Sequence, residues 1–77
     1  MNSPERRDIT ARQLEVLEAI TRLTREEGYP PTIRELGAAL EIASTNGVMD
    51  HLRALRKKGH LAWVPGRSRT LRVLRTG

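Results

Sequence analysis

The chain contains 77 residues, with 14 Lys or Arg against 9 Asp or Glu, a formal net charge of +5 and no cysteine. This length fits a single small domain, and the lack of cysteine excludes a disulfide framework and a thiolate metal site. The sequence has no apolar run of membrane-spanning length and no signal-peptide pattern at its start, so we expect a cytoplasmic protein without membrane association.

The positive charge is unevenly distributed along the chain. Residues 1–50 contain 6 Lys or Arg and 9 Asp or Glu, whereas residues 51–77 contain 8 Lys or Arg and no acidic residue. Such a concentration suits a polyanion, of which nucleic acid is the commonest. A merely solvated charged surface is the simplest alternative. An anionic membrane is a weaker one, because the basic segment lacks a face rich in large apolar residues.

The first predicted element is a helix that follows a flexible polar arm at residues 1–8. Thr10 and Gln13 have the spacing of a capping box, in which each side chain bonds the backbone of the other residue. We expect the helix to run to about Glu27, because Gly28 is a helix-stop signal. The predicted buried side of this helix contains Val16, Leu17, Ile20 and Leu23.

A second, shorter helix is predicted after the prolines at positions 30–31, which force an extended linker. Thr32 and Glu35 form another capping-box pattern, and apolar residues recur at helical spacing as far as Leu40. Gly37 is small enough to allow the close approach of a neighbouring helix.

The chain is organised around a third predicted helix within residues 44–59. Ser44 is placed to cap its start, and Gly59 sits where a helix ends through a left-handed residue. One side of the helix is apolar, while the other begins with small polar groups and ends in cations. Because residues 41–43 make only a short turn before it, the second and third helices together predict a helix-turn-helix. The apolar side contains Val48, Leu52 and Leu55.

A basic β-hairpin is predicted at the end of the chain. Strands at 60–64 and 70–74 flank the turn residues 65–69. Because two strands alone are marginally stable, this hairpin must pack on the helices. Three helices followed by such a hairpin give a mainly α fold, a winged helix-turn-helix spanning 9–75. The residues expected to face inward are Leu61, Trp63, Leu71 and Val73.

The polar side of the third helix supplies the candidates for contact with DNA bases. The Asn46 amide can pair bidentately with adenine, or it can merely help to cap the helix. Gly47 costs the helix about 1 kcal/mol relative to alanine, which suggests close approach to a base pair or simple tolerance near the helix start. Met49 can pack on a thymine methyl, or it can contact the wing or the linker instead. Asp50 can accept from a cytosine amine or orient Arg53. The full set of base-contact candidates is Ser44, Thr45, Asn46, Gly47, Met49 and Asp50.

The cations around this helix and at the hairpin tip are candidates for phosphate contacts, which position a protein on DNA without reading sequence. Arg67 and Arg69 at the tip can enter a narrow minor groove, or they belong to a solvated loop. Cations at the end of the third helix complete this set, which comprises Arg53, Arg56, Lys57 and Lys58.

No catalytic, metal or cofactor site is predicted. Ser44, Asp50 and His51 lie on one short helix, where the geometry of a catalytic triad cannot form. His51 and His60 lack Cys or carboxylate companions at metal-ligand spacing, so we interpret both as structural.

Three motifs at matching spacing resemble the N-terminal DNA-binding domain of the LexA family, repressors of the bacterial DNA-damage (SOS) response. These motifs are Thr10-Ala11-Arg12-Gln13, Gly28-Tyr29-Pro30-Pro31-Thr32 and His51-Leu52-x-Ala54-Leu55-x-x-Lys58-Gly59. The resemblance runs without apparent gaps from Ile9 to Leu74.

This resemblance implies a dimer on a palindromic operator, with the third helix in the major groove and the wing near the backbone or minor groove. It implies that Ser44 and Asn46 touch DNA, and it places three cations near phosphate: Arg12, Lys58 and Arg69. Gly47 and Met49 depart from the best-known members, which leaves the operator sequence open. The self-cleaving peptidase of LexA-like repressors has no counterpart in these residues, so damage-induced cleavage is not implied.

The sequence therefore predicts a double-stranded DNA-binding repressor, bacterial or phage-type and associated with the nucleoid. Two copies on an inverted repeat, as a weak homodimer or a cooperative pair, would be needed for tight binding. Alternatives are a winged-helix module that binds another repressor or the transcription machinery, a non-specific DNA-packaging protein and, least favoured, an enzyme.

Overall fold

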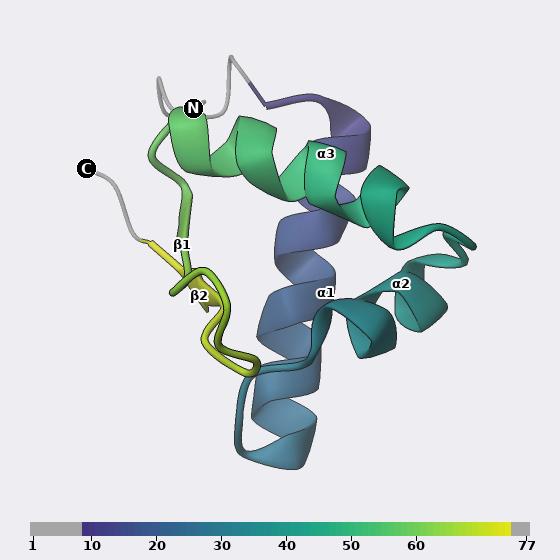
Figure 1. Cartoon of the computed structure of the whole chain (residues 1–77), viewed down its shortest axis with the longest axis vertical. Coiled ribbons are helices and arrows are strands. Elements are labelled where there is room, and N and C mark those ends of the chain that lie inside the picture. The colour runs from purple at the N-terminus through teal and green to yellow at the C-terminus, as the bar shows by residue number, and fades with distance from the viewer. Residues whose placement is uncertain (1–8, 75–77) are drawn as a thin grey trace, which may run out of the picture.

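The computed structural model describes residues 9–74, so the predicted arm at 1–8 and the last residue of the predicted domain lie outside the described residues. Three helices precede two short strands, which confirms the predicted winged helix-turn-helix (Figure 1). The elements are α1 (Ala11–Glu27), α2 (Ile33–Leu40), α3 (Thr45–Lys57), β1 (Leu61–Ala62) and β2 (Arg72–Val73).

The helices and the hairpin surround one core. In Figure 1, α3 lies across one end of α1, and α2 and the hairpin flank α1 on opposite sides. Helix α2 packs on both α1 and α3, whereas β1 adjoins α3 and β2 adjoins α1. The hairpin is thereby tied to the helices through both of its strands.

The predicted capping boxes fix where α1 and α2 begin. The Thr10 hydroxyl accepts from the Gln13 backbone N–H at 3.0 Å, and the Thr10 N–H donates to Gln13 Oε1 at 3.1 Å. Thr32 and Glu35 repeat this arrangement, with both bonds at 3.0 Å. Gly28, with a φ of 85°, ends α1 in the left-handed conformation that glycine adopts without strain.

Helix α3 begins and ends as its sequence predicts. The Asn46 backbone N–H donates to the Ser44 hydroxyl at 3.1 Å, which makes Ser44 the N-cap. At the other end Gly59 has a φ of 85°, and the His60 N–H donates to the Leu55 carbonyl at 3.0 Å. This pattern satisfies the last carbonyls of the helix and turns the chain toward β1.

The core is formed by one side of each helix together with the hairpin. Three of the predicted inward residues, Leu23, Trp63 and Val73, are only partly buried and pack against this core. Because α3 turns its apolar side inward, its polar side remains on the surface. The buried hydrophobic residues that form this core are Val16, Leu17, Ala19, Ile20, Leu36, Val48, Leu52, Leu55, Leu61 and Leu71.

The strands are shorter than predicted. Among residues 9–74 the strand register pairs Leu61 with Val73 and Ala62 with Arg72, antiparallel, and the Leu74 N–H donates to the His60 carbonyl beside them. The predicted bounds 60–64 and 70–74 were therefore wrong. Further out, the Val64 N–H donates to the Thr70 hydroxyl at 2.9 Å, and that hydroxyl donates to the Arg67 carbonyl at 3.0 Å. A threonine side chain therefore replaces the backbone ladder in the outer half of the wing.

We expect Gly37→Ala to destabilise the helix-turn-helix by about 1 kcal/mol, although alanine favours an isolated helix by about the same amount. A Cβ at this position would lie 3.2 Å from both the Ile42 carbonyl oxygen and the Val48 Cγ2. The Ile42 oxygen belongs to the backbone, and Val48 is a buried β-branched residue of α3, so neither atom can easily move away from the new methyl group. Urea unfolding of the two proteins measures the difference, and a more stable alanine variant would contradict the prediction.

Candidate nucleic-acid interface

The first turn of α3 presents polar groups to solvent. Ser44, Thr45, Asn46 and Asp50 are all exposed. The backbone N–H of Asn46 is used by the Ser44 cap, but its side-chain amide has no hydrogen-bond partner within residues 9–74. This amide can therefore donate and accept simultaneously, as the edge of a base requires.

Two other base-contact candidates have contacts within the domain. A Cβ on Gly47 would lie 3.1 Å from Ile42 Cγ2, so the glycine allows the turn before α3 to pack closely. Met49 is partly buried against the core and lines a hollow of about 250 Å³ between the wing and the helices. For Gly47 in particular, the packing of the turn explains the residue without reference to DNA.

Asp50 lies beside Arg53, one helical turn further along α3. Asp50 Oδ1 is 3.6 Å from the Arg53 Nη1, and the two side chains are 78% and 60% exposed. An exposed pair of this kind stabilises a protein little. It does, however, direct the arginine along the surface of α3 and partly neutralise an acid on a cationic face.

The cations at the end of α3 also differ in their contacts. The Arg56 guanidinium lies over the Trp63 ring, 4.2 Å from its centroid. Lys58 donates from Nζ to Gln13 Oε1 at 3.0 Å, which links the end of α3 to the capping box of α1. Lys57 is exposed and has no partner within the described residues. All three keep their positive charge at the surface.

The two arginines of the wing tip, Arg67 and Arg69, differ in their side-chain contacts. Arg67 is exposed, and its guanidinium has no hydrogen-bond, ion-pair or ring partner among residues 9–74. Arg69 instead bonds Glu35 through both guanidinium termini, at 3.0 and 3.1 Å. These bonds hold the pKa of the Glu35 carboxyl below its ordinary value. The two arginines lie in the same loop, but the Arg69 guanidinium is directed toward Glu35 of α2, whereas that of Arg67 has no such partner among residues 9–74.

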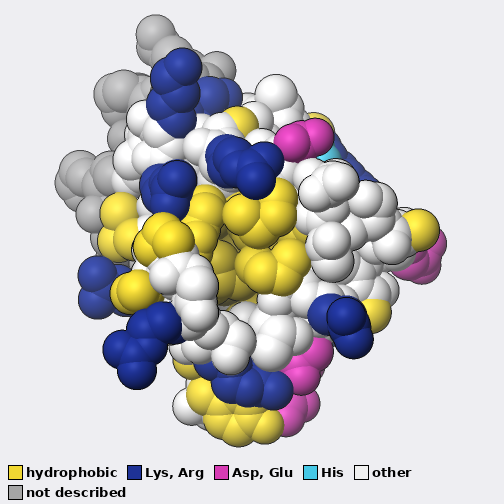
Figure 2. All heavy atoms as spheres, viewed as in Figure 1, with side chains coloured by type: hydrophobic (Ala, Val, Ile, Leu, Met, Phe, Trp, Pro, Cys, Tyr) yellow, Lys and Arg dark blue, Asp and Glu magenta, His cyan; other side chains and the backbone are white. Residues whose placement is uncertain are grey.

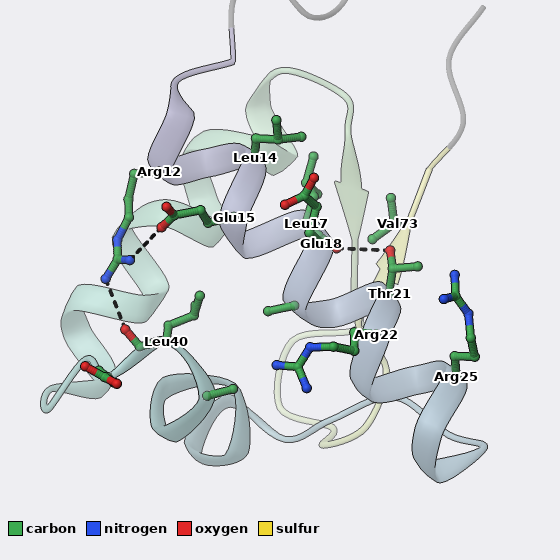
Figure 3. A pocket seen from close by; sticks show the side chains of 13 residues that line it. Arg12, Leu14, Glu15, Leu17, Glu18, Thr21, Arg22, Arg25, Leu40 and Val73 are labelled. Carbon is green, nitrogen blue, oxygen red and sulfur yellow. Dashed lines mark hydrogen bonds and ion pairs between the residues drawn. The ribbon is translucent and has the colours of Figure 1, made fainter.

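Arg12 lies on α1 and contacts the end of α2 (Figure 3). Its Nη1 donates to Glu15 Oε1 at 2.8 Å, and its Nη2 donates to the Leu40 carbonyl at 3.2 Å. A cation bonded to a last-turn carbonyl stabilises a helix C-terminus. Both contacts in Figure 3 border a groove of about 860 Å³ along α1, which no residue of α3 lines.

The face shared by α3, α2 and the wing combines an apolar centre with a cationic border (Figure 2). In the view of Figure 2, hydrophobic side chains gather between these elements, with Lys and Arg side chains around most of their border and a few Asp and Glu side chains on its right. The apolar hollow is lined by residues from the linker, α2, α3 and the wing, including Pro31, Ile33, Met49, Trp63 and Leu71. A surface of this kind suits a ligand that carries negative charge outside and apolar methyl groups inside, as the major groove does.

Neither histidine belongs to a metal site in the part of the chain that the structure describes. No group of three or more His, Cys, Asp or Glu residues there could hold a metal ion. His60 is only 4% exposed and lies directly after α3. None of the helices within residues 9–74 has the length and hydropathy needed to cross a membrane.

The sequence matches the family described as the LexA DNA binding domain over residues 6–70. The chain belongs to this family. The resemblance inferred from the three sequence motifs is thereby confirmed, and so is the winged fold that the LexA family implies. The LexA match covers α1, α2, α3 and β1 and reaches Thr70 in the wing.

Relatives named LexA repressor share the N-terminal region. One from Anaeromyxobacter sp. (strain Fw109-5) is 60% identical over 63 residues, which is 82% of this chain and 27% of the relative. One from Sorangium cellulosum (strain So ce56) is 55% identical over 64 residues, 83% of this chain and 28% of the relative. One from Myxococcus xanthus (strain DK1622) is 50% identical over 64 residues, which is 83% of this chain and 29% of the relative. The chain thus spans less than a third of the length of these LexA repressors.

Sequence reasoning on this LexA domain missed the partners of Arg69. Glu35 was interpreted only as part of a capping box and Tyr29 only as part of the family motif at 28–32, yet both contact the Arg69 guanidinium. Glu35 and Arg69 are 34 positions apart, so no local pattern connects them. The one available signal is that a bidentate partner of arginine must be a carboxylate, and residues 51–77 contain none.

Proposed function

We propose that this LexA-type domain binds double-stranded DNA sequence-specifically and serves as the DNA-reading part of a transcriptional repressor. The observation that carries the proposal is the first turn of α3, where the exposed Asn46 amide has no partner among residues 9–74. It stands on a helix-turn-helix whose surface ends in cations. Such a helix can enter the major groove with its N-terminal residues against base edges.

In this proposal the polar start of α3 reads the bases. Asn46 is the principal reader, and Asp50 and Met49 extend the contact along the groove. The residues proposed to face the bases are Ser44, Thr45, Asn46, Gly47, Met49 and Asp50.

The cations beyond this turn and on the wing bind the phosphate backbone, which fixes the register of α3 in the groove. Arg67 is the proposed wing contact, because it is exposed at the tip. The α3 cations proposed to bind phosphate are Arg53, Arg56, Lys57 and Lys58. Arg12 on α1 extends the contact only when it exchanges its Glu15 partner for a phosphate.

One such domain covers a small area of DNA and binds weakly by itself. We therefore infer that the operator is an inverted repeat occupied by two copies, as a weak dimer or as a cooperative pair. A protein with this function works on the bacterial nucleoid in the cytoplasm. The LexA names of the relatives support a repressor in the response to DNA damage.

Selection of bound sequences from a random duplex pool tests the proposal, followed by the variant Asn46→Ala. We expect the wild-type domain to select a motif, and the variant to lose about tenfold or more of its discrimination at one base pair. Helix α3 stays capped in the variant, because the cap comes from Ser44. Glu18→Ala, on the exposed side of α1, is the control that leaves the motif unchanged. Unaltered preference in Asn46→Ala would refute base reading by this helix.

A further inference from the structure

Arg69 makes more contacts within the domain than any other arginine described above. Its Nη1 donates to Glu35 Oε1 at 3.1 Å and to the Pro30 carbonyl at 3.2 Å, and its Nη2 donates to Glu35 Oε2 at 3.0 Å. Its guanidinium also stacks on Tyr29, 4.7 Å from the ring centroid. A bidentate pair with a stacked ring fixes orientation as well as distance. We refer to Arg69, Glu35, Pro30 and Tyr29 as the wing clamp.

The acid of the wing clamp already has a structural role. Glu35 Oε1 accepts the Thr32 backbone N–H at 3.0 Å, so the same carboxylate closes the capping box of α2. The clamp thus joins the wing to the first residues of the helix-turn-helix. Hydrogen bonds from Arg69 first, and from the Thr32 backbone second, keep the pKa of Glu35 below its ordinary value.

The backbone of Arg69 provides independent support. Its φ is 60°, in the left-handed region that a residue with a Cβ adopts at a cost of about 1 kcal/mol. Glycine would fit there without strain, as Gly66 does in the same loop with a φ of 81°. A strained residue of this kind persists when its surroundings hold it, and here the side-chain contacts of the clamp do so.

The wing is also held from α3. Arg56 lies over Trp63 at the root of the wing. In the outer half of the wing, the Thr70 hydroxyl accepts from the Val64 N–H and donates to the Arg67 carbonyl. The wing is therefore fixed to α3 on one side and to α2 on the other. Arg67 projects from between these attachments without a partner among residues 9–74.

We propose that Arg69 is a positioning residue, which grips Glu35 and Tyr29 so that the wing stands at a fixed angle to α3 and presents Arg67 to a phosphate. This inference rests on the proposed DNA binding and deepens it. It gives Arg69 a task different from the phosphate contact that its charge alone suggests. Arg69 acts through Arg67, whereas Arg67 touches the DNA.

The two roles predict opposite effects of Glu35→Gln. If Arg69 bound phosphate, losing the carboxylate would free a cation and remove an anion, so DNA affinity would rise. If Arg69 positions the wing, affinity falls even though the net charge becomes more positive. Glutamine is also an accepted capping-box residue, so α2 keeps its N-terminal cap in this variant.

The test measures the dissociation constant of Glu35→Gln, Arg69→Gln, their double variant and Arg67→Gln on the duplex selected by the wild-type protein. We expect Glu35→Gln and Arg69→Gln each to weaken binding about fivefold, and the double variant to be no weaker than either, because both remove one interaction. Arg67→Gln should reduce the slope of log affinity against log salt by about one. Arg69→Gln should leave the slope unchanged, because Arg67 still reaches its phosphate in this variant and the lost affinity is the added cost of ordering the wing on DNA. Tighter binding by Glu35→Gln, or a reduced slope in Arg69→Gln, would overturn the proposal.

A measurement without DNA keeps the clamp testable by itself. NMR titration of the Glu35 carboxyl in the wild-type domain should show a lowered pKa, which returns toward the ordinary value in Arg69→Gln but not in the matched control Arg67→Gln. An unchanged Glu35 titration in Arg69→Gln would show that the clamp does not form in solution. If the clamp forms but the wild-type domain selects no duplex, the proposed function fails and the proposed role of Arg69 fails with it. If the domain selects a duplex but Glu35→Gln tightens binding, only the role of Arg69 fails.

Discussion

Replacing Leu52 with alanine is expected to remove most of the stability of this domain. Leu52 is fully buried in the middle of α3, in the cluster where the three helices meet the hairpin. Deleting a buried leucine side chain leaves a cavity and costs about 2–5 kcal/mol. A chain of this size has a total of only about 5 kcal/mol, so a loss of about 3 kcal/mol leaves about 2 kcal/mol and raises the unfolded fraction roughly 100-fold, to about 3% at ambient temperature. For a loss of about 3 kcal/mol the melting temperature falls by about 12–24 °C.

Urea unfolding with two probes measures this loss. Far-UV circular dichroism reports the helices, and fluorescence of Trp63, the only tryptophan, reports the contact of the wing root with Arg56. Coincident curves would show that helices and wing unfold together. Val64→Ala is the matched control, because Val64 is 50% exposed and its truncation should change stability by less than about 0.5 kcal/mol. Equal losses from both substitutions would contradict the core described here.

The helices were predictable because their signals are local. Each capping box spans four positions, and its two hydrogen bonds depend on nothing outside that segment. The apolar side of α3 follows directly from the spacing of Val48, Leu52 and Leu55, all of which are buried. Gly28 and Gly59 marked the helix ends for the same reason, since both have the positive φ that helix termination requires.

The wing was predicted less well because its structure depends on distant residues. Alternating polar and apolar residues indicated strands of normal length, but Thr70 replaces most of the ladder with side-chain bonds to Val64 and Arg67. The direction of Arg69 is set by Glu35, which lies on another element. Gly47, which is proposed to face the bases, also packs closely against Ile42 of the preceding turn, and no local pattern indicates this contact. In each case the local structure depends on a tertiary contact, which composition and periodicity cannot reveal.

The cations of this chain differ in whether they have partners within the domain. The sequence identifies the cations, but only the structure shows which of them have partners within the domain. Arg12 bonds Glu15 and the Leu40 carbonyl, and Arg69 bonds Glu35, so both are partly neutralised before DNA is present. The number of phosphates bound should therefore be smaller than the number of cations predicted to bind them.

Salt dependence measures that number, and its expected effect on affinity is large. If each domain neutralises about five phosphates, log affinity should fall with log salt at a slope of about −4.5. Binding would then weaken by about 500-fold between about 50 and 200 mM salt. The cations that give this estimate are Arg53, Arg56, Lys57, Lys58 and Arg67.

Fluorescence anisotropy of a labelled half-site duplex over this range of salt gives the slope for one domain. Lys57→Gln should reduce the slope by about one, because Lys57 is exposed and has no partner within residues 9–74. Arg25→Gln removes the same charge from the exposed side of α1 and should leave the slope unchanged. A slope steeper than about −6 would mean that Arg12 and Arg69 leave their carboxylate partners to bind phosphate. A slope near zero would mean that the cationic face of α3 and the wing does not bind the DNA backbone at all.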